Sequence, residues 1–312
     1  MELIAKVTRQ CDMACKFCSA ATIKDDLLTV DEIVNEVKNL KPSTIILLGG
    51  EALLRGPEFY YDLLSKVSCR LDFTTNLKEF YRDPDPWVDL FKNPRVGVCT
   101  SFNYGNTRMW DSKTIYDENM FRKVMSLFNS KIGYTPMFIA VIDYKNMHLW
   151  RKHIELAKEL GTVCRLNGTV SIGKSASSYF PRYEMFKIWI QCVKEGLDKY
   201  EVNSSERHIG RCPFNTGDNS CIDNIRVIEK INGQIVYSYC DDMNNRKCWY
   251  TKQENVTDKI EPLSSDCYSC ELFRLCNGCR SNWLDIQAAK DTNWCREMLS
   301  LKDILIEQGW KL

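Results

Sequence analysis

Residues 11–18 read Cys11-Asp-Met-Ala-Cys15-Lys-Phe-Cys18 and come directly after a β-rich run, Glu2 to Val7. Three thiolates with gaps of three and two residues can hold one corner of a cubane iron–sulfur cluster and leave its fourth iron without a protein ligand. Structural zinc is the alternative, but closed zinc sites generally take four protein ligands, and no histidine lies near this loop. Catalytic groups of βα barrels lie on the loops that follow the strands. The stretch therefore predicts a barrel of βα units with a catalytic metal loop after its first strand.

The first two thirds of the chain alternate β-rich runs with amphipathic helical stretches, which is typical of βα units around a parallel sheet. Thr29 and Glu32 form a capping-box pattern ahead of a first helix. Six strands are predicted, at Glu2 to Val7, Thr44 to Leu48, Arg70 to Thr75, Val96 to Ser101, Met137 to Ile142 and Thr162 to Val170. Helical periodicity predicts further helices at Pro86 to Phe91, Asn119 to Phe128, Met147 to Leu160 and Tyr183 to Leu197.

The composition is that of an ordinary globular protein, with 44% hydrophobic and 27% charged residues. Forty-two basic residues against 41 acidic ones give a net charge of +1, so no global field attracts nucleic acid. No apolar run approaches the ~20 residues of a membrane-spanning helix, and Met1 to Gln10 lacks the apolar core of a signal peptide. We therefore expect a cytoplasmic protein without membrane or nucleic-acid partners.

Sixteen cysteines are a large excess for a cytosolic chain, because disulfides rarely persist in that compartment. Buried free thiols explain only the single cysteines in apolar stretches, which are Cys69, Cys99, Cys164 and Cys192. The later cysteines form a dense array: Cys212, Cys221, Cys240, Cys248, Cys267, Cys270, Cys276, Cys279 and Cys295. By spacing alone this array suits either zinc or iron–sulfur centres.

The character of the chain changes near Glu201, where long apolar periods give way to cysteines and polar residues. We predict a barrel over residues 1–205, a small cysteine-rich domain over 206–298, and a C-terminal helix over 299–312. Within the second domain, Asn232-Gly233 between two β-rich runs predicts a hairpin from Ile225 to Tyr239. The histidines, at 148, 153 and 208, are scattered, and none is predicted to bind metal.

At the first cysteine loop the chain resembles the radical S-adenosylmethionine (SAM) superfamily. The signature of that family is this three-cysteine loop after the first strand, with an aromatic residue, here Phe17, before the last cysteine. The resemblance implies a partial (β/α)6 TIM-like barrel in which Cys11, Cys15 and Cys18 hold a SAM-binding [4Fe-4S] cluster. It also implies that an electron from the cluster cleaves SAM to methionine and a 5′-deoxyadenosyl radical, which takes a hydrogen atom from the substrate.

The resemblance continues after the second strand, with Gly49-Gly50-Glu51-Ala52. Family members carry Gly-Gly-Glu-Pro there, and its backbone and carboxylate receive the amino group of SAM. Glycines let a ligand approach the backbone closely, and a carboxylate complements an ammonium group. Ala52 stands where proline is usual, which leaves the contacts of the first three residues possible.

Polar residues end the next two strands, at Thr75-Asn76 and Ser101. In the family these positions face SAM or the substrate, and the resemblance implies SAM contacts for Asn76 and Ser101. Arg108 is the candidate partner of the SAM carboxylate. Polar caps at strand ends are the alternative interpretation.

The later cysteines resemble a SPASM domain, an extension that holds two auxiliary [4Fe-4S] clusters. The resemblance implies one cluster on Cys212, Cys221, Cys240 and Cys279, and a second on Cys267, Cys270, Cys276 and Cys295. The gap before Cys279 is two residues where the family has three. Cys248 is an extra thiol that could substitute as a ligand, act as a hydrogen-atom donor or, by default, be an ordinary free thiol. Asp241 is either a base that takes a proton from the substrate or part of a solvated Asp241-Asp242 pair.

Three classes of function are compatible with these features. The first is a radical SAM oxidoreductase or maturase that oxidises, crosslinks or epimerises a peptide or protein side chain. No leader-binding domain is expected ahead of Cys11, so we expect the substrate to bind directly or through a separate helper protein. The second is a radical dehydrogenase or rearrangement enzyme acting on a sugar, amino acid or nucleotide. The third, a cluster-storing or electron-transfer protein, is disfavoured by Gly49-Gly50-Glu51. Either enzyme needs an electron donor such as flavodoxin or ferredoxin.

Overall fold

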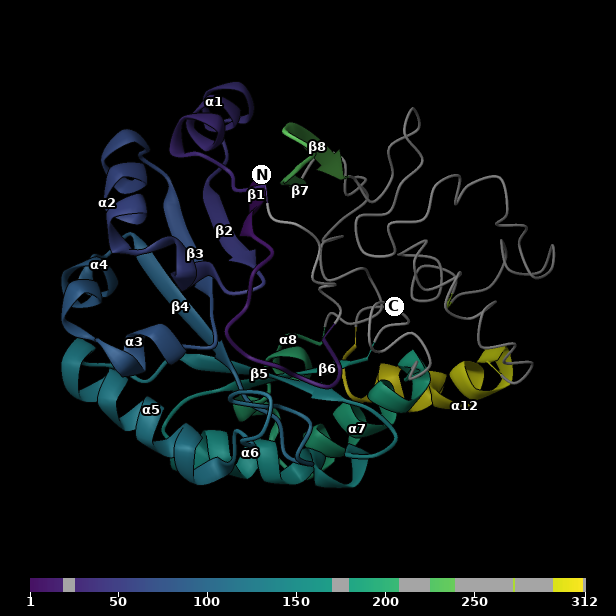
Figure 1. Cartoon of the computed structure of the whole chain (residues 1–312). Helices are drawn as coiled ribbons and strands as arrows, with labels where there is room; N and C mark the ends of the chain where they lie inside the picture. The colour runs from purple at the N-terminus through teal and green to yellow at the C-terminus, as the bar shows by residue number, and fades with distance from the viewer. Residues whose placement is uncertain (19–25, 170–179, 208–224, 239–271, 273–293, 311–312) are drawn as a thin grey trace.

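One eight-stranded sheet organises the computed structural model, which describes residues 1–18, 26–169, 180–207, 225–238, 272 and 294–310 (Figure 1). Its strands are β1 (Glu2–Thr8), β2 (Thr44–Gly49), β3 (Arg70–Thr74), β4 (Val96–Ser101), β5 (Met137–Ile142), β6 (Cys164–Gly168), β7 (Ile225–Ile231) and β8 (Gln234–Ser238). The order across the sheet is β6-β5-β4-β3-β2-β1-β7-β8, and β1 to β6 run parallel. All six predicted strands are confirmed, and with them the α/β fold of a partial barrel.

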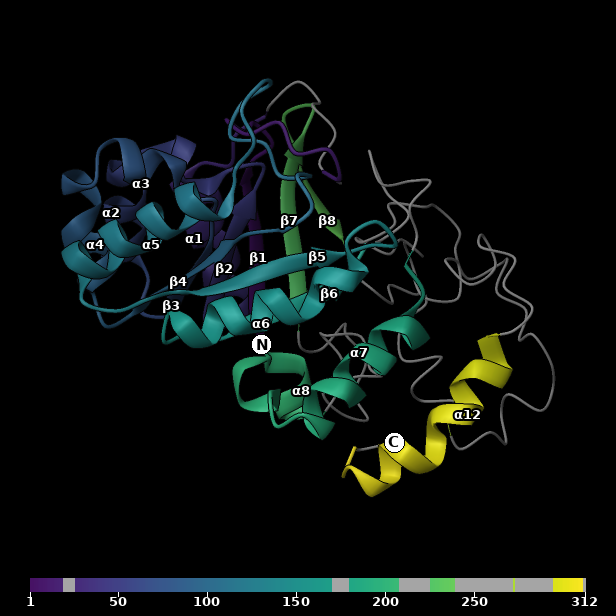
Figure 2. The ribbon, with the colours of Figure 1, turned by 90° about the horizontal axis from the view of Figure 1, so that it is seen from below.

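Helices cover the convex face of the sheet (Figures 1 and 2). They are α1 (Val30–Leu40), α2 (Pro57–Lys66), α3 (Lys78–Arg82), α4 (Val88–Lys92), α5 (Glu118–Ile132) and α6 (Trp150–Glu159). The capping box is confirmed, since Glu32 N donates to Thr29 Oγ1 at 3.2 Å and Thr29 N donates to the Glu32 carboxylate at 2.8 Å. The sequence prediction missed α2 and α3. The start signal of α2, Pro57 at the first helical position, was present in the sequence.

The two faces of the sheet differ because side chains alternate along each strand. Leu3, Ile45, Leu71 and Phe138 are buried beneath the helices and belong to the main core. The opposite, concave face carries a smaller apolar cluster of Ile4 and Val227, with Ile46 and Leu48 against it. The carboxyl ends of the parallel strands meet at one edge, which brings the loops after β1 to β4 together.

The β7–β8 hairpin is confirmed at its predicted position, with Asn232 and Gly233 both at positive φ, 50° and 78°. Its place in the sheet was not predicted. β7 pairs in parallel with β1, with Ile4 opposite Val227, so the hairpin extends the barrel sheet. Lys230 Nζ contacts the Glu32 carboxylate of α1 at 2.8 Å. A strand's own pattern does not reveal its partner, because pairing joins segments far apart in sequence.

In the described part of the chain after β6 lie the helices α7 (Arg182–Lys194), α8 (Val202–Glu206) and α12 (Trp294–Glu307). The last begins earlier than the predicted Leu299 and packs against α7. The Phe186 and Trp310 rings meet edge to face there, at 5.8 Å between centroids. Within the described residues, no helix combines the length and apolar character needed to cross a membrane.

Candidate functional site

The cysteine loop lies across the carboxyl-terminal edge of the sheet and is held on both sides by backbone hydrogen bonds. On one side, Gly50 N donates to Thr8 O at 2.8 Å and Glu51 N donates to Gln10 O at 2.7 Å. On the other, Ala14 N donates to Met109 O at 3.2 Å and Lys16 N donates to Thr107 O at 2.9 Å. The loop is therefore fixed between the end of β2 and the segment after β4.

Gly49 and Gly50 make this close approach possible. A Cβ atom at Gly49 would overlap the carbonyl oxygen of Thr8, and one at Gly50 would overlap those of Arg9 and Gln10. The sequence prediction assigned the glycines to the approach of a ligand. In the structure they are needed for contact between two parts of the chain, because only glycine lets these backbones meet.

N–H groups point at the sulfur atoms of Cys11 and Cys15 in the loop. Cys11 Sγ lies 3.4 Å from Met13 N and 4.0 Å from Asn76 Nδ2, and Cys15 Sγ lies 3.9 Å from Arg108 Nη1. Such donors stabilise the negative charge of metal-bound thiolates. Cys11 keeps an exposed edge, yet desolvation by its neighbours raises the pKa of its thiol to about 12. Metal binding at this sulfur must therefore displace a proton.

Three thiols in one loop match the protein ligands of a cubane cluster that keeps one iron open. Across the described ranges, no three His, Cys, Asp or Glu side chains converge on one ion. The thiolates of a cubane bind different irons, so they lie farther apart than the ligands of one ion. Three thiols in one fixed loop, with N–H donors at Cys11 and Cys15, are a donor set that suits a [4Fe-4S] cluster.

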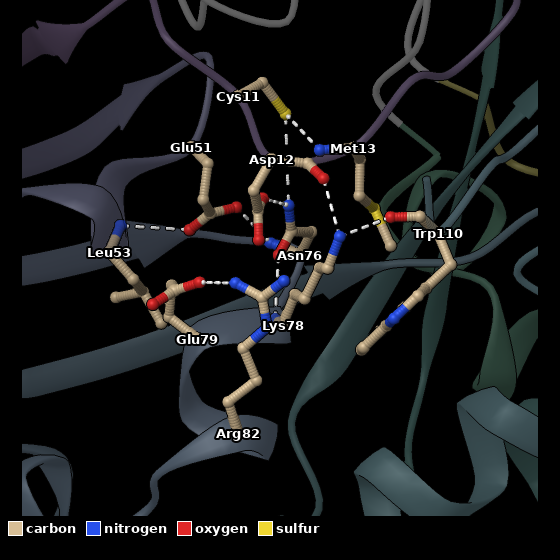
Figure 3. Close-up of polar contacts among 10 residues, drawn as sticks. All are labelled: Cys11, Asp12, Met13, Glu51, Leu53, Asn76, Lys78, Glu79, Arg82 and Trp110. Carbon is tan, nitrogen blue, oxygen red and sulfur yellow. Dashed lines mark hydrogen bonds and ion pairs between the residues drawn. The ribbon is translucent and has the colours of Figure 1, made fainter. Parts of the chain in front are cut away.

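Asp12, Asn76 and Lys78 form a polar network beneath Cys11 (Figure 3). Asn76 Nδ2 donates to Asp12 Oδ1 at 2.8 Å, and its Oδ1 accepts from Lys78 N at 2.8 Å. The Lys78 side chain is buried, and its Nζ donates to Asp12 O at 2.6 Å and to Trp110 O. Lys78 thus ties the cysteine loop to the segment after β4. The sequence analysis missed this residue, although it lies only two positions after Asn76.

Glu51 is buried at the centre of the site, at 1% exposure. Its carboxylate accepts hydrogen bonds from Leu53 N at 3.0 Å, Thr75 Oγ1 at 2.5 Å and Asn76 N at 2.7 Å. Burial raises its pKa to about 7, and the three hydrogen bonds only partly oppose this shift. The sequence prediction gave this carboxylate to the SAM amino group. In the structure it joins the ends of β2 and β3.

Among the described residues, the buried polar atoms near the loop that have no hydrogen-bond partner include Asp12 Oδ2 and Arg108 Nε. Arg108 also donates through Nη2 to Asn103 Oδ1 at 3.1 Å and lies over the Phe17 ring, 5.1 Å from its centroid. An unused carboxylate oxygen and an unused guanidinium nitrogen fit the ammonium and carboxylate of an amino-acid group such as that of SAM. Asp12 and Asn103 were missed because their roles depend on contacts across loops.

Other predicted residues have less defined surroundings. Ser101 ends β4 on the concave face and is half-buried. His153 is buried: its Nε2 accepts from Tyr104 N at 3.0 Å, and burial lowers its pKa to about 4. Cys295 is exposed in the first turn of α12. The other predicted auxiliary ligands and Asp241 lie outside the described residues: Cys212, Cys221, Cys240, Cys267, Cys270, Cys276 and Cys279.

The barrel part of the chain matches a known protein family. The sequence pattern of the radical SAM superfamily matches residues 5–176, which include the end of β1, the cysteine loop and β2 to β6. The chain belongs to the radical SAM superfamily. Membership of this superfamily implies an enzyme that uses SAM and a [4Fe-4S] cluster. No curated protein sequence matches the chain.

Several solved structures share the fold of this radical SAM protein. Histidine-tagged anSMEcpe with bound AdoMet has a TM-score of 0.64 at 16% identity, covering 99% of this chain and 96% of the other. SuiB from Streptococcus suis bound to S-adenosylmethionine has a TM-score of 0.58 at 15% identity, covering 90% and 73%. SuiB bound to its precursor peptide SuiA has a TM-score of 0.57 at 16% identity, covering 90% and 72%. Similarity at this level of identity shows a common fold.

Proposed function

We propose that this protein is a radical SAM maturase that abstracts a hydrogen atom from a peptide or protein side chain. The observation that carries the proposal is the fixed three-cysteine loop at the carboxyl edge of the sheet, with N–H donors directed at its sulfurs. When bound there, the cluster supplies the electron that cleaves SAM to methionine and a 5′-deoxyadenosyl radical, which takes the hydrogen atom.

The residues of this chain have distinct tasks in the proposal. Cys11, Cys15 and Cys18 hold the cluster, and Asn76 and Arg108 donate to its sulfurs. The unused oxygen of Asp12 and the unused nitrogen of Arg108 bind the methionine end of SAM, together with the backbone of Gly49 to Glu51 and the Ser101 hydroxyl. The concave face of the sheet shields the reacting groups from water.

The peptide substrate is supported by the shared fold with SuiB, whose structure contains the precursor peptide SuiA. Oxidation, crosslinking or epimerisation of a side chain would each begin with the same hydrogen abstraction. We further propose that residues 206–298 form a SPASM-type domain, in which eight later cysteines hold two auxiliary clusters and Asp241 takes a proton from the substrate. A flavodoxin or ferredoxin would supply electrons. The spacing of the cysteines supports this part of the proposal.

The first experiment measures SAM cleavage. Anaerobically reconstituted protein is supplied with dithionite and SAM, and methionine and 5′-deoxyadenosine are quantified by mass spectrometry. Cys15→Ala should abolish both products, whereas Cys69→Ala, a matched change of a thiol outside the loop, should leave them unchanged. Wild-type protein that forms neither product refutes the proposal.

A second measurement tests the auxiliary clusters and the substrate. Three clusters predict about twelve irons per wild-type chain and about eight in Cys15→Ala, whereas a chain with a single cluster holds about four. Incubation with candidate peptides and deuterium tracing into 5′-deoxyadenosine then identifies the substrate. Deuterium transfer from a sugar, free amino acid or nucleotide, with none from peptides, would replace the maturase by a small-molecule enzyme.

A further inference from the structure

A charged side chain faces the concave side of the sheet at β6. Cys164 and Leu166 are buried beneath the helices, so Arg165 between them projects from the opposite face. The strand register places Arg165 beside Ile139 of β5, which lies beside Ser101 of β4. Arg165 therefore lies in the same row as the last residue of β4, on the face that is proposed to shield the reacting groups from water.

Arg165 has no partner within the part of the chain that the structure describes. Its Nε is buried without a hydrogen bond, and no described carboxylate forms an ion pair with its guanidinium group. Two carboxylates of the same face are already engaged. Asp72 pairs with Arg70 at 2.7 Å, and Glu229 pairs with Lys6 at 3.3 Å and Arg9 at 2.5 Å.

An unpaired, partly buried cation is costly, because it loses hydration without gaining a counter-charge. The guanidinium group lies near the Cys99 thiol. Burial raises the pKa of this thiol to about 12, and the positive charge of Arg165 opposes part of that rise. A neutral thiol does not compensate a positive charge. Among the described residues, the charge of Arg165 therefore lacks a counter-ion on the concave face.

We propose that Arg165 is a substrate-binding residue that holds a carboxylate of the peptide substrate on the concave face. A guanidinium group binds carboxylates through two parallel hydrogen bonds, which fixes orientation as well as position. Arg108 contacts the cysteine loop and is already proposed to bind the methionine end of SAM. Arg165 is therefore the arginine proposed to bind the substrate. This inference rests on the proposed peptide substrate and defines its class as acidic.

The test compares the charge preference of peptides retained by the anaerobic holoenzyme with SAM. Two random heptapeptide libraries are used, one containing Asp and Glu and one containing Asn and Gln in their place. Wild-type protein should retain the acidic library about tenfold more strongly, the ratio expected for one charge-assisted hydrogen-bond pair. Arg165→Gln should lose this preference, and Arg165→Glu should reverse it in favour of the library with Asn and Gln. Arg151→Gln, an exposed change on α6, is the matched control.

Two results would overturn the assignment. The first is an acidic preference that Arg165→Gln leaves intact. The second is a loss of SAM affinity in Arg165→Gln, measured by calorimetry, without any change in peptide preference, because the anion is then the SAM carboxylate. Cluster absorbance and circular dichroism verify that each variant is folded, and Arg165→Lys supplies a milder change if the others are not.

A wild-type protein that retains neither library refutes the peptide substrate without deciding the role of Arg165. Malonate then serves as the probe in thermal denaturation of the holoenzyme. An anion site at Arg165 predicts a saturable rise in the melting temperature of the wild type and only a linear drift in Arg165→Gln. Identical curves for the two proteins would refute the anion site itself.

Discussion

Replacing Glu51 tests whether this buried carboxylate holds the strand ends together as well as serving the cofactor. Glu51→Ala leaves three donors, Leu53 N, Thr75 Oγ1 and Asn76 N, without their acceptor. A buried hydrogen bond contributes ~1 kcal/mol net, so three lost bonds destabilise the protein by about 3 kcal/mol. Glu51→Gln keeps one oxygen for two of these donors and turns an N–H group toward the third. We expect it to cost about half as much.

The assay is urea denaturation of the metal-free, reduced protein under argon, monitored by tryptophan fluorescence. Glu58→Gln, an exposed change in the first turn of α2, is the matched control and should alter the free energy of unfolding by less than about 0.5 kcal/mol. The expected order of stability is wild type, Glu51→Gln, Glu51→Ala. A Glu51→Ala protein as stable as the control would refute the structural role, and the carboxylate would then serve only to bind a ligand.

Three other perturbations probe the same site. Burial raises the pKa of Glu51 from about 4.5 in the unfolded chain to about 7 in the folded one, so the folded state binds more protons between these pH values. The free energy of unfolding of the wild type, relative to that of Glu51→Gln, should therefore fall by up to about 1.4 kcal/mol per pH unit as pH rises from 5.5 to 7. Urea denaturation at each pH measures this difference. Lys78→Met removes the ammonium group that ties the cysteine loop to the segment after β4; iron content after reconstitution should fall, whereas exposed Lys92→Met should retain it. Gly50→Ala should lower the melting temperature and the iron content more than Gly133→Ala, because a Cβ at Gly133 meets open space and costs only about 1 kcal/mol for its positive φ.

Local features of the sequence were sufficient to predict the architecture of the barrel. The three-cysteine spacing, the alternation of β and helical runs, the Thr29 capping box and the Asn232-Gly233 turn each depend on residues near one another in the chain. Short elements were less predictable. The five-residue helix α3 offers too few positions for a helical period to emerge, and the start signal of α2 lies in a single proline.

The partners of individual side chains required the tertiary structure. The sequence showed that Gly49, Gly50 and Glu51 belong together. It did not show that they contact the backbone of Thr8 to Gln10 and the end of β3, because these segments are separated along the chain. The same holds for Lys78 and for the pairing of β7 with β1.

By itself, the sequence determined that this chain forms parallel βα units and carries a cysteine loop suited to an iron–sulfur cluster, because both properties are set by short-range period and spacing. Only the tertiary structure decided which charges are neutralised and which are left unpaired. Arg165 is one of 42 basic residues in the sequence, and nothing distinguishes it until the sheet places it on the concave face without an ion-pair partner among the described residues. Neutralisation depends on distances of a few ångströms between distant segments, and folding alone sets those distances.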